Sequence, residues 1–96
     1  MRELAGIDSL LSKARQYELA QHRLDSLHPG EFNQAERAYY SLLFTQSHYK
    51  NYIDDTTDAV INEAVDYYEH HGDREKYTRA LLYRGCVYQM MGDAEK

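Results

Sequence analysis

The sequence has little of what marks several common classes of protein. Cys86 is its single cysteine, so no disulfide bond can form within the chain. No apolar run approaches the length of a membrane-spanning helix or of a signal-peptide core. Tryptophan is absent, and one proline and five glycines leave room for long helices. These features favour one small helical domain, and a hydrophobic content of 43% is enough for its core.

Positive charge is also scarce. The chain carries 11 Lys and Arg residues against 16 Asp and Glu residues, which gives a net charge of -5. A protein that holds nucleic acid usually shows a basic patch, and this sequence shows none. We therefore expect no direct nucleic-acid binding by this segment.

Patterns typical of catalysis and metal binding are missing as well. There is no Gly-rich phosphate loop and no serine at a sharp strand-to-helix turn, and Cys86 lies in a stretch that reads as packed core. His70 and His71 are adjacent and diverge by ~100° around a helix, so they cannot chelate together. Asp66 and His70 would supply only one edge of a metal site. We expect no enzyme activity, no cofactor and no metal.

Apolar residues recur at helical spacing along the whole chain. This periodicity predicts about four helices, separated by residues that end or begin helices. Asn33 followed by Glu36 is typical of a capping box, and Asp54 or Asp55 is expected to cap the next helix. The expected stops are Pro29-Gly30, Gly72 and Gly92. The predicted helices cover residues 4–27, 32–52, 55–71 and 74–91.

Residues 80–93 resemble the first helix of a tetratricopeptide repeat and the turn that follows it. The family places a large apolar residue, a glycine, a tyrosine and a Gly-Asp turn at fixed offsets. Here those places are held by Leu81, Gly85, Tyr88 and Gly92-Asp93. We expect Gly85 to let a neighbouring helix approach closely and Tyr88 to fill the space between helices. Arg84 departs from the pattern, since leucine is usual there.

Three further runs, residues 38–43, 49–51 and 58–68, look like the N-terminal region of a group of bacterial proteins. In that group divergent tetratricopeptide repeats form the sensor part, which often precedes a membrane-spanning helix, a coiled coil and a helix-turn-helix output domain. The resemblance implies a sensory or scaffolding fragment of a larger regulatory protein. It leaves open whether that protein works in the bacterial cytoplasm or in the periplasm and cell envelope.

The expected fold is all-α, with antiparallel helical hairpins stacked as a tetratricopeptide-like, right-handed array. Residues 1–96 would form a single domain of about two hairpins. The repeat that starts near residue 80 lacks its second helix, so we expect a piece of a longer array.

One expected function is non-catalytic binding of a protein or peptide. The predicted helix 55–71 carries an acidic stripe opposite its apolar face, formed by Asp55, Asp58, Asp66 and Glu69. Such a stripe is either a solvated face that pairs across the hairpin or a surface that steers a basic peptide. For binding, we predict Tyr40, Tyr83 and Arg84 as contact residues and Asp66 as the steering charge.

The alternative function is self-association. The predicted helix 74–91 is apolar nearly all round, so it should have neighbours on two sides. An apolar patch would be exposed where the second neighbour is missing, and a closed two-fold homodimer is the simplest way to cover it. The predicted contact residues are Leu82, Tyr83, Met90 and Met91.

Overall fold

The computed structural model describes residues 2–55 and 57–95, with side chains as far as Gly92. This part of the chain contains helices and no strand, which confirms the all-α class. The elements in chain order are α1 (Arg2–Ser12), α2 (Tyr17–Asp25), a short 3-10 helix (Pro29–Glu31), α3 (Gln34–Lys50), α4 (Ala59–His71) and α5 (Arg74–Glu95).

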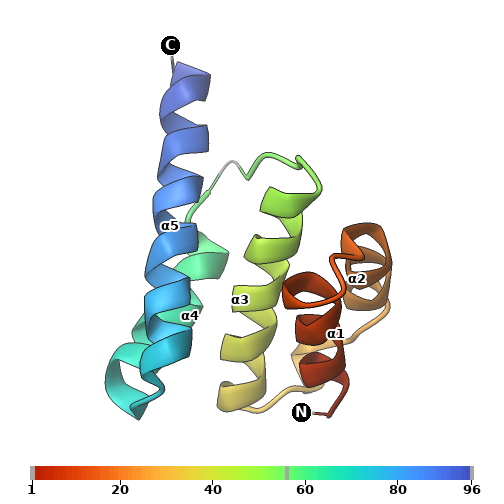
Figure 1. Ribbon diagram of the computed structural model, residues 1–96. Coiled ribbons are helices and arrows are strands. Elements are labelled where there is room, and N and C mark those ends of the chain that lie inside the picture. Colours follow the sequence, from red (N-terminus) through yellow and green to blue (C-terminus); the bar gives the residue numbers. More distant parts are fainter. Residues whose placement is uncertain (1, 56, 96) are drawn as a thin grey trace.

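Helix α3 lies at the centre of the arrangement (Figure 1). On one side it contacts the α1–α2 hairpin, and on the other it contacts α4 and α5, which also pack on each other. Successive helices run in opposite directions, so α1, α3 and α5 are roughly parallel (Figure 1). The short connections therefore produce antiparallel neighbours, as the sequence predicts.

The prediction of one long first helix is wrong, because the chain folds back within it. Helix α1 ends at Ser12 and α2 begins at Tyr17. The turn between them is closed by a hydrogen bond from Gln16 N–H to Leu10 O, and Arg15 adopts a left-handed conformation with φ 55°. The apolar spacing is helical on both sides of this turn, and no Gly or Pro marks it. Periodicity alone therefore predicts one continuous helix across this turn. The described chain has five α-helices instead of the predicted four.

Three helix ends in the middle of the chain follow their sequence signals. The Asn33 side chain accepts the Glu36 N–H at 2.8 Å, and Glu36 accepts the Asn33 N–H at 3.1 Å, so the predicted capping box is confirmed. Gly72, with φ 76°, ends α4 as predicted. Asp73 then accepts the Lys76 N–H at 3.1 Å and caps the start of α5.

Two glycines behave differently from the prediction. Gly92 does not stop α5, which continues to Glu95. Among the described glycines, Gly72 alone has the positive φ that ends a helix in this way. A side chain at Gly85 would meet no atom within 4 Å, so no helix approaches closely there. The reason is geometric, because Ala80 and Val87 turn toward the core and leave Gly85 on the solvent side of α5.

The buried side chains form two clusters, one on each side of α3. Leu43 of α3 faces α1 and α2, whereas the adjacent Leu42 faces α4 and α5. The first cluster contains Leu4, Ile7, Leu11, Ala20, Leu24, Tyr39 and Leu43. The second contains Ala38, Leu42, Ile61, Ala64, Val65, Tyr68, Ala80, Tyr83 and Val87. Ala14, which the long-helix prediction placed on the apolar stripe, is exposed in the turn.

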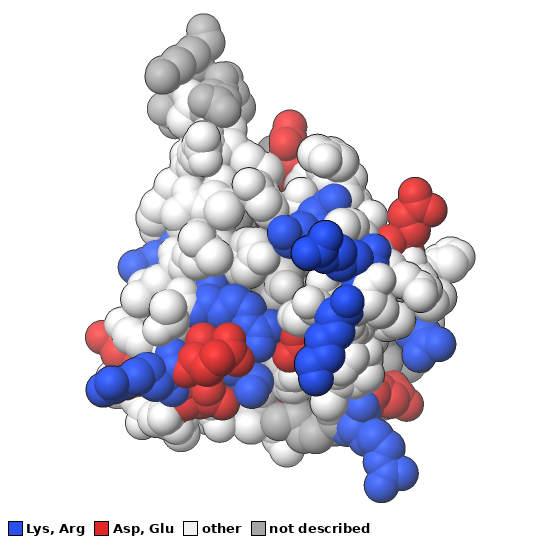
Figure 2. Space-filling model, viewed as in Figure 1, with Lys and Arg blue, Asp and Glu red and all other residues white. Residues whose placement is uncertain are grey.

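Charge is unevenly spread on the surface. Figure 2 shows Lys and Arg side chains gathered over α1 and the neighbouring end of α3, on a face where Asp and Glu are sparser. The chain as a whole has a net charge of -5. A basic region therefore exists on this acidic protein, although the sequence contains no run of basic residues that would predict it.

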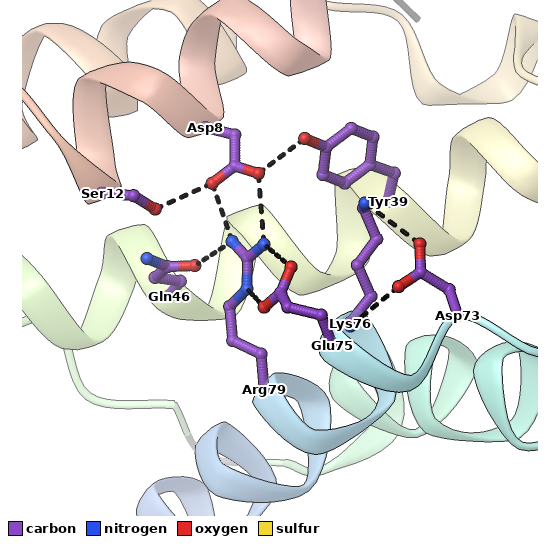
Figure 3. Close-up of polar contacts among 8 residues, drawn as sticks. All are labelled: Asp8, Ser12, Tyr39, Gln46, Asp73, Glu75, Lys76 and Arg79. Carbon is purple, nitrogen blue, oxygen red and sulfur yellow. Dashed lines mark hydrogen bonds and ion pairs between the residues drawn. The ribbon is translucent and has the colours of Figure 1, made fainter.

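Arg79 of α5 connects the two clusters (Figure 3). Its Nη1 and Nη2 lie 2.7 and 3.2 Å from the two carboxylate oxygens of Asp8 in α1, which is a bidentate ion pair. It also donates to Glu75 within α5 at 2.8 Å and to the Oε1 of Gln46 in α3 at 3.1 Å. One side chain thus ties α1, α3 and α5 together.

Asp8 is held in its charged form by the same network. It accepts the Tyr39 hydroxyl at 2.6 Å and the Ser12 hydroxyl at 2.9 Å. Burial by itself raises the pKa of Asp8, but the hydrogen bonds from Arg79, Tyr39 and Ser12 outweigh burial and hold this pKa below its usual value. Burial and the hydrogen bond to Asp8 raise the pKa of Tyr39, so its hydroxyl remains a donor.

The exposed position of Gly85 predicts that Gly85→Ala stabilises the protein. Alanine favours a helix over glycine by about 0.5–1 kcal/mol, and its methyl group meets no neighbour at this site. Urea unfolding followed by circular dichroism should show that gain. The matched control is Gly72→Ala, which should destabilise because position 72 has φ 76°. A loss of stability in Gly85→Ala would contradict the exposed position.

The Asp8–Arg79 pair predicts a pH-dependent contribution to stability. Asp8→Asn should cost about 1.5–3 kcal/mol near neutral pH, the usual range for hydrogen bonds to a charged group. Because the pKa of Asp8 is lowered in the folded state, its contribution is complete above the unfolded pKa and is lost as the pH falls through the folded pKa. The stability difference between the parent and Asp8→Asn should therefore shrink below about pH 4.

Urea unfolding at a series of pH values measures that difference. Glu69→Gln is the matched control, since Glu69 is exposed and makes no ion pair with a described residue. Its effect should be small at every pH. If the cost of Asp8→Asn stays the same down to about pH 2.5, the ion pair does not stabilise the fold in the way described.

Candidate functional site

The structure does not bring the three predicted contact residues and the predicted steering charge into one site. Tyr40 packs against Phe32, with ring centroids 5.8 Å apart, and against the first cluster. Tyr83 is only 7% exposed and belongs to the second cluster. Arg84 extends from α5 toward the Asn62 amide of α4, at 3.4 Å. Asp66 is exposed on α4, where it borders a groove.

The predicted acidic stripe is only partly free. Asp55 does not cap a helix: one of its oxygens lies 2.9 Å from His48 Nδ1, and the other is buried without a partner among the described residues. Asp58 accepts the Tyr88 hydroxyl from α5 at 3.0 Å. Asp66 and Glu69 remain exposed, so the free negative charge lies toward the C-terminal end of α4.

A groove of about 650 Å³ runs between the N-terminal half of α3 and the C-terminal half of α4. Ala38 lies in its wall, and Arg37 and Glu63 form an ion pair across it at 3.3 Å. No described residue pairs with the Asp66 carboxylate. The lining residues are Gln34, Arg37, Ala38, Glu63, Asp66, Tyr67, His70 and His71. The groove therefore offers one paired cation and one unpaired carboxylate.

Aromatic rings make up one wall of this groove. The rings of Tyr67 and His71 are stacked, with centroids 4.0 Å apart and planes within 5° of each other. His71 Nδ1 donates to the Tyr67 carbonyl oxygen at 2.8 Å, and His70 Nδ1 donates in the same way to the Asp66 carbonyl. Because a carbonyl oxygen only accepts, Nδ1 carries the hydrogen and Nε2 is left for another partner. The sequence contained a signal for the stack, since Tyr67 and His71 are four residues apart on a helix.

The residues predicted for self-association differ in exposure. Leu82 is 61% exposed on α5, whereas Tyr83 is buried. Met90 and Met91 are partly buried against the second cluster. Tyr88, predicted to fill a space between helices, is 47% exposed. The apolar surface of α5 is thus carried by Leu82 and Tyr88 more than by the methionines.

The described residues contain neither a metal-binding cluster nor a membrane-spanning helix. No group of three or more His, Cys, Asp or Glu side chains is close enough to hold a metal ion in this part of the chain. No helix within it is long and apolar enough to cross a membrane. Comparisons of the sequence and structure with protein families, with curated proteins and with solved structures give no match.

Proposed function

We propose that the chain is a non-catalytic, tetratricopeptide-like module that binds a protein or peptide segment. The arrangement of helices supports this proposal. Each of the first two hairpins, α1–α2 and α3–α4, packs onto the first helix of the next unit, and α1, α3 and α5 lie in one row. Such stacking leaves helix faces and grooves open to partners, as repeat proteins do. The resemblance to bacterial sensor regions extends the proposal to a sensory or scaffolding role in a larger regulatory protein.

The observation that carries the proposal is the groove between α3 and α4. An extended peptide could place an aromatic or aliphatic side chain on the Tyr67–His71 stack and a Lys or Arg beside the unpaired Asp66 carboxylate. The cation that borders the groove, Arg37, is neutralised by Glu63. The segment that fits best therefore combines positive charge with an apolar or aromatic side chain.

Titration with a labelled peptide of alternating Lys and Tyr, followed by fluorescence anisotropy, tests this function. Binding should weaken about two- to fivefold in Asp66→Asn, as expected for an exposed charge pair. Tyr67→Ala should weaken it further, because the ring platform is lost. Glu69→Gln is the matched control, an exposed acid that does not line the groove, and it should bind like the parent.

Two results would contradict this function. One is equal affinity for a peptide of alternating Glu and Tyr, since the groove would then not select positive charge. The other is equal weakening by Asp66→Asn and Glu69→Gln, since the peptide would then respond to overall charge and not to the groove.

Self-association remains the second candidate, and the exposure of Leu82 favours it. If α5 meets a second copy, the apparent mass from light scattering should rise with concentration, and Leu82→Glu should prevent that rise. His22→Glu is the matched control, since His22 is exposed on α2 and not on α5. A parent protein that stays monomeric at every concentration excludes this function for the chain.

A further inference from the structure

A second pocket, separate from the α3–α4 groove, lies where the α1–α2 turn meets the C-terminal half of α3 and the middle of α5. Its volume is about 540 Å³, which is in the range of small-molecule sites. It shares no lining residue with the groove. Its walls include Ser12, Arg15, Tyr17, Gln46, Lys50 and Tyr83. No Asp or Glu is among the described residues that line it.

Gln46 is a buried residue whose amide nitrogen is open to this pocket. The residue is only 4% exposed, and its Oε1 accepts the Arg79 N–H at 3.1 Å. Because a guanidinium only donates, this bond fixes which end of the amide faces Arg79. The amide nitrogen points the other way (Figure 3), and it has no hydrogen-bond partner among the described residues. Among the described residues the one buried side-chain atom without a partner is Asp55 Oδ2, so the Gln46 N–H opens onto the pocket, where a ligand oxygen can accept from it.

Tyr83 is a second buried residue whose donor is open to the pocket. It is 7% exposed, it lines the pocket, and its hydroxyl has no partner among the described residues. Burial raises the pKa of Tyr83, so the hydroxyl keeps its proton. Two nearly buried side chains on two different helices thus leave donors unpaired in the same pocket.

Arg15 and Lys50 add positive charge at the same place. Neither makes an ion pair with a described residue, in contrast to Arg37, Lys76 and Arg79. The Lys50 ammonium lies 5.8 Å from the centre of the Tyr17 ring, which keeps it over the pocket wall. Both residues line the pocket.

The backbone holds Arg15 in an unusual conformation to place it there. Its φ of 55° is uncommon for a residue with a side chain, and such strain is concentrated at functional sites. The turn is anchored by Asn51, whose amide donates to the Tyr17 carbonyl oxygen at 2.9 Å. The turn and the end of α3 are therefore fixed relative to each other before any ligand arrives.

We propose that this pocket binds a small molecule that carries an oxyanion, either a carboxylate or a phosphate. The two cations attract the anion, and the Gln46 amide and the Tyr83 hydroxyl donate to its oxygens. Asp8, which accepts from Ser12 beside the pocket, does not oppose the anion because Arg79 neutralises it. A nucleic acid fits less well, since it needs a track of cations along its backbone and the chain has a net charge of -5.

Titration with citrate and, separately, with inorganic phosphate tests the site. The readouts are isothermal calorimetry and the ¹⁵N-resolved side-chain amide signal of Gln46. We expect saturable binding of at least one anion, with a shift of that signal. Arg15→Gly should weaken binding tenfold or more, the scale expected from losing a charged hydrogen bond. Lys50→Met should also weaken it, while keeping an apolar stem against the Tyr17 ring.

Arg15→Gly removes the charged side chain but should keep the fold, because glycine accepts positive φ without strain. Weaker anion binding by this variant would therefore come from the lost side chain and not from unfolding. Its matched control is Tyr52→Gly. Tyr52 has φ 59° and is 94% exposed, and it does not line this pocket, so the change relieves the same kind of strain without removing a lining residue. Circular dichroism should show both variants folded, and Tyr52→Gly should bind like the parent.

Tighter binding of citrate would indicate a carboxylate ligand, and tighter binding of phosphate would indicate a phosphorylated ligand. Either result supports the proposal that the pocket binds an oxyanion. Absence of saturable binding of both anions overturns it. So does equal weakening by Arg15→Gly and Tyr52→Gly, which would indicate adventitious binding of anions to the surface. An oligothymidylate that binds more tightly than either anion, and whose binding is lost in Arg15→Gly and Lys50→Met, would replace the small-molecule proposal with a nucleic-acid site.

Discussion

The ion pair between Arg79 and Asp8 is the interaction on which the rest of the structure depends. The two residues are 71 positions apart, and their side chains are about 15% exposed. They join the α1–α2 side of the molecule to the α4–α5 side across α3, whose neighbouring leucines, Leu42 and Leu43, belong to different hydrophobic clusters. In a chain of this size neither cluster is large, so a well-satisfied polar link between them contributes both stability and a fixed relative position.

The same guanidinium also determines the chemistry nearby. By occupying the Oε1 of Gln46, Arg79 turns the amide nitrogen toward the pocket that contains Arg15 and Lys50. The molecule then has two surfaces of opposite character. One is the α3–α4 groove, with the free Asp66 carboxylate, and the other is the donor-lined pocket. A helical module with both surfaces could hold a basic segment and respond to a small anion, which suits the sensory or scaffolding role proposed above.

Local signals in the sequence predicted what local physics decides. The Asn33–Glu36 capping box and the Gly72 stop were readable because each depends on residues within one turn. The split between α1 and α2 was not readable, since Arg15 adopts the left-handed conformation that usually attracts Gly or Asn. Gly85 and Tyr83 show the same limit. Their exposure depends on which face of α5 meets the core, and the nearly continuous apolar surface of that helix does not specify it. No sequence pattern marked Gln46 and Lys50 as residues of the donor-lined pocket, because tertiary packing alone brings them close to Arg15.

A double-mutant cycle of Asp8→Ala and Arg79→Ala, measured by urea unfolding at neutral pH, tests the central interaction most directly. If the pair links the two clusters, the two changes together should cost less than the sum of their separate costs, by about 1 kcal/mol or more. Additive costs, within about 0.5 kcal/mol, would show that Asp8 and Arg79 stabilise the fold independently and would contradict the account.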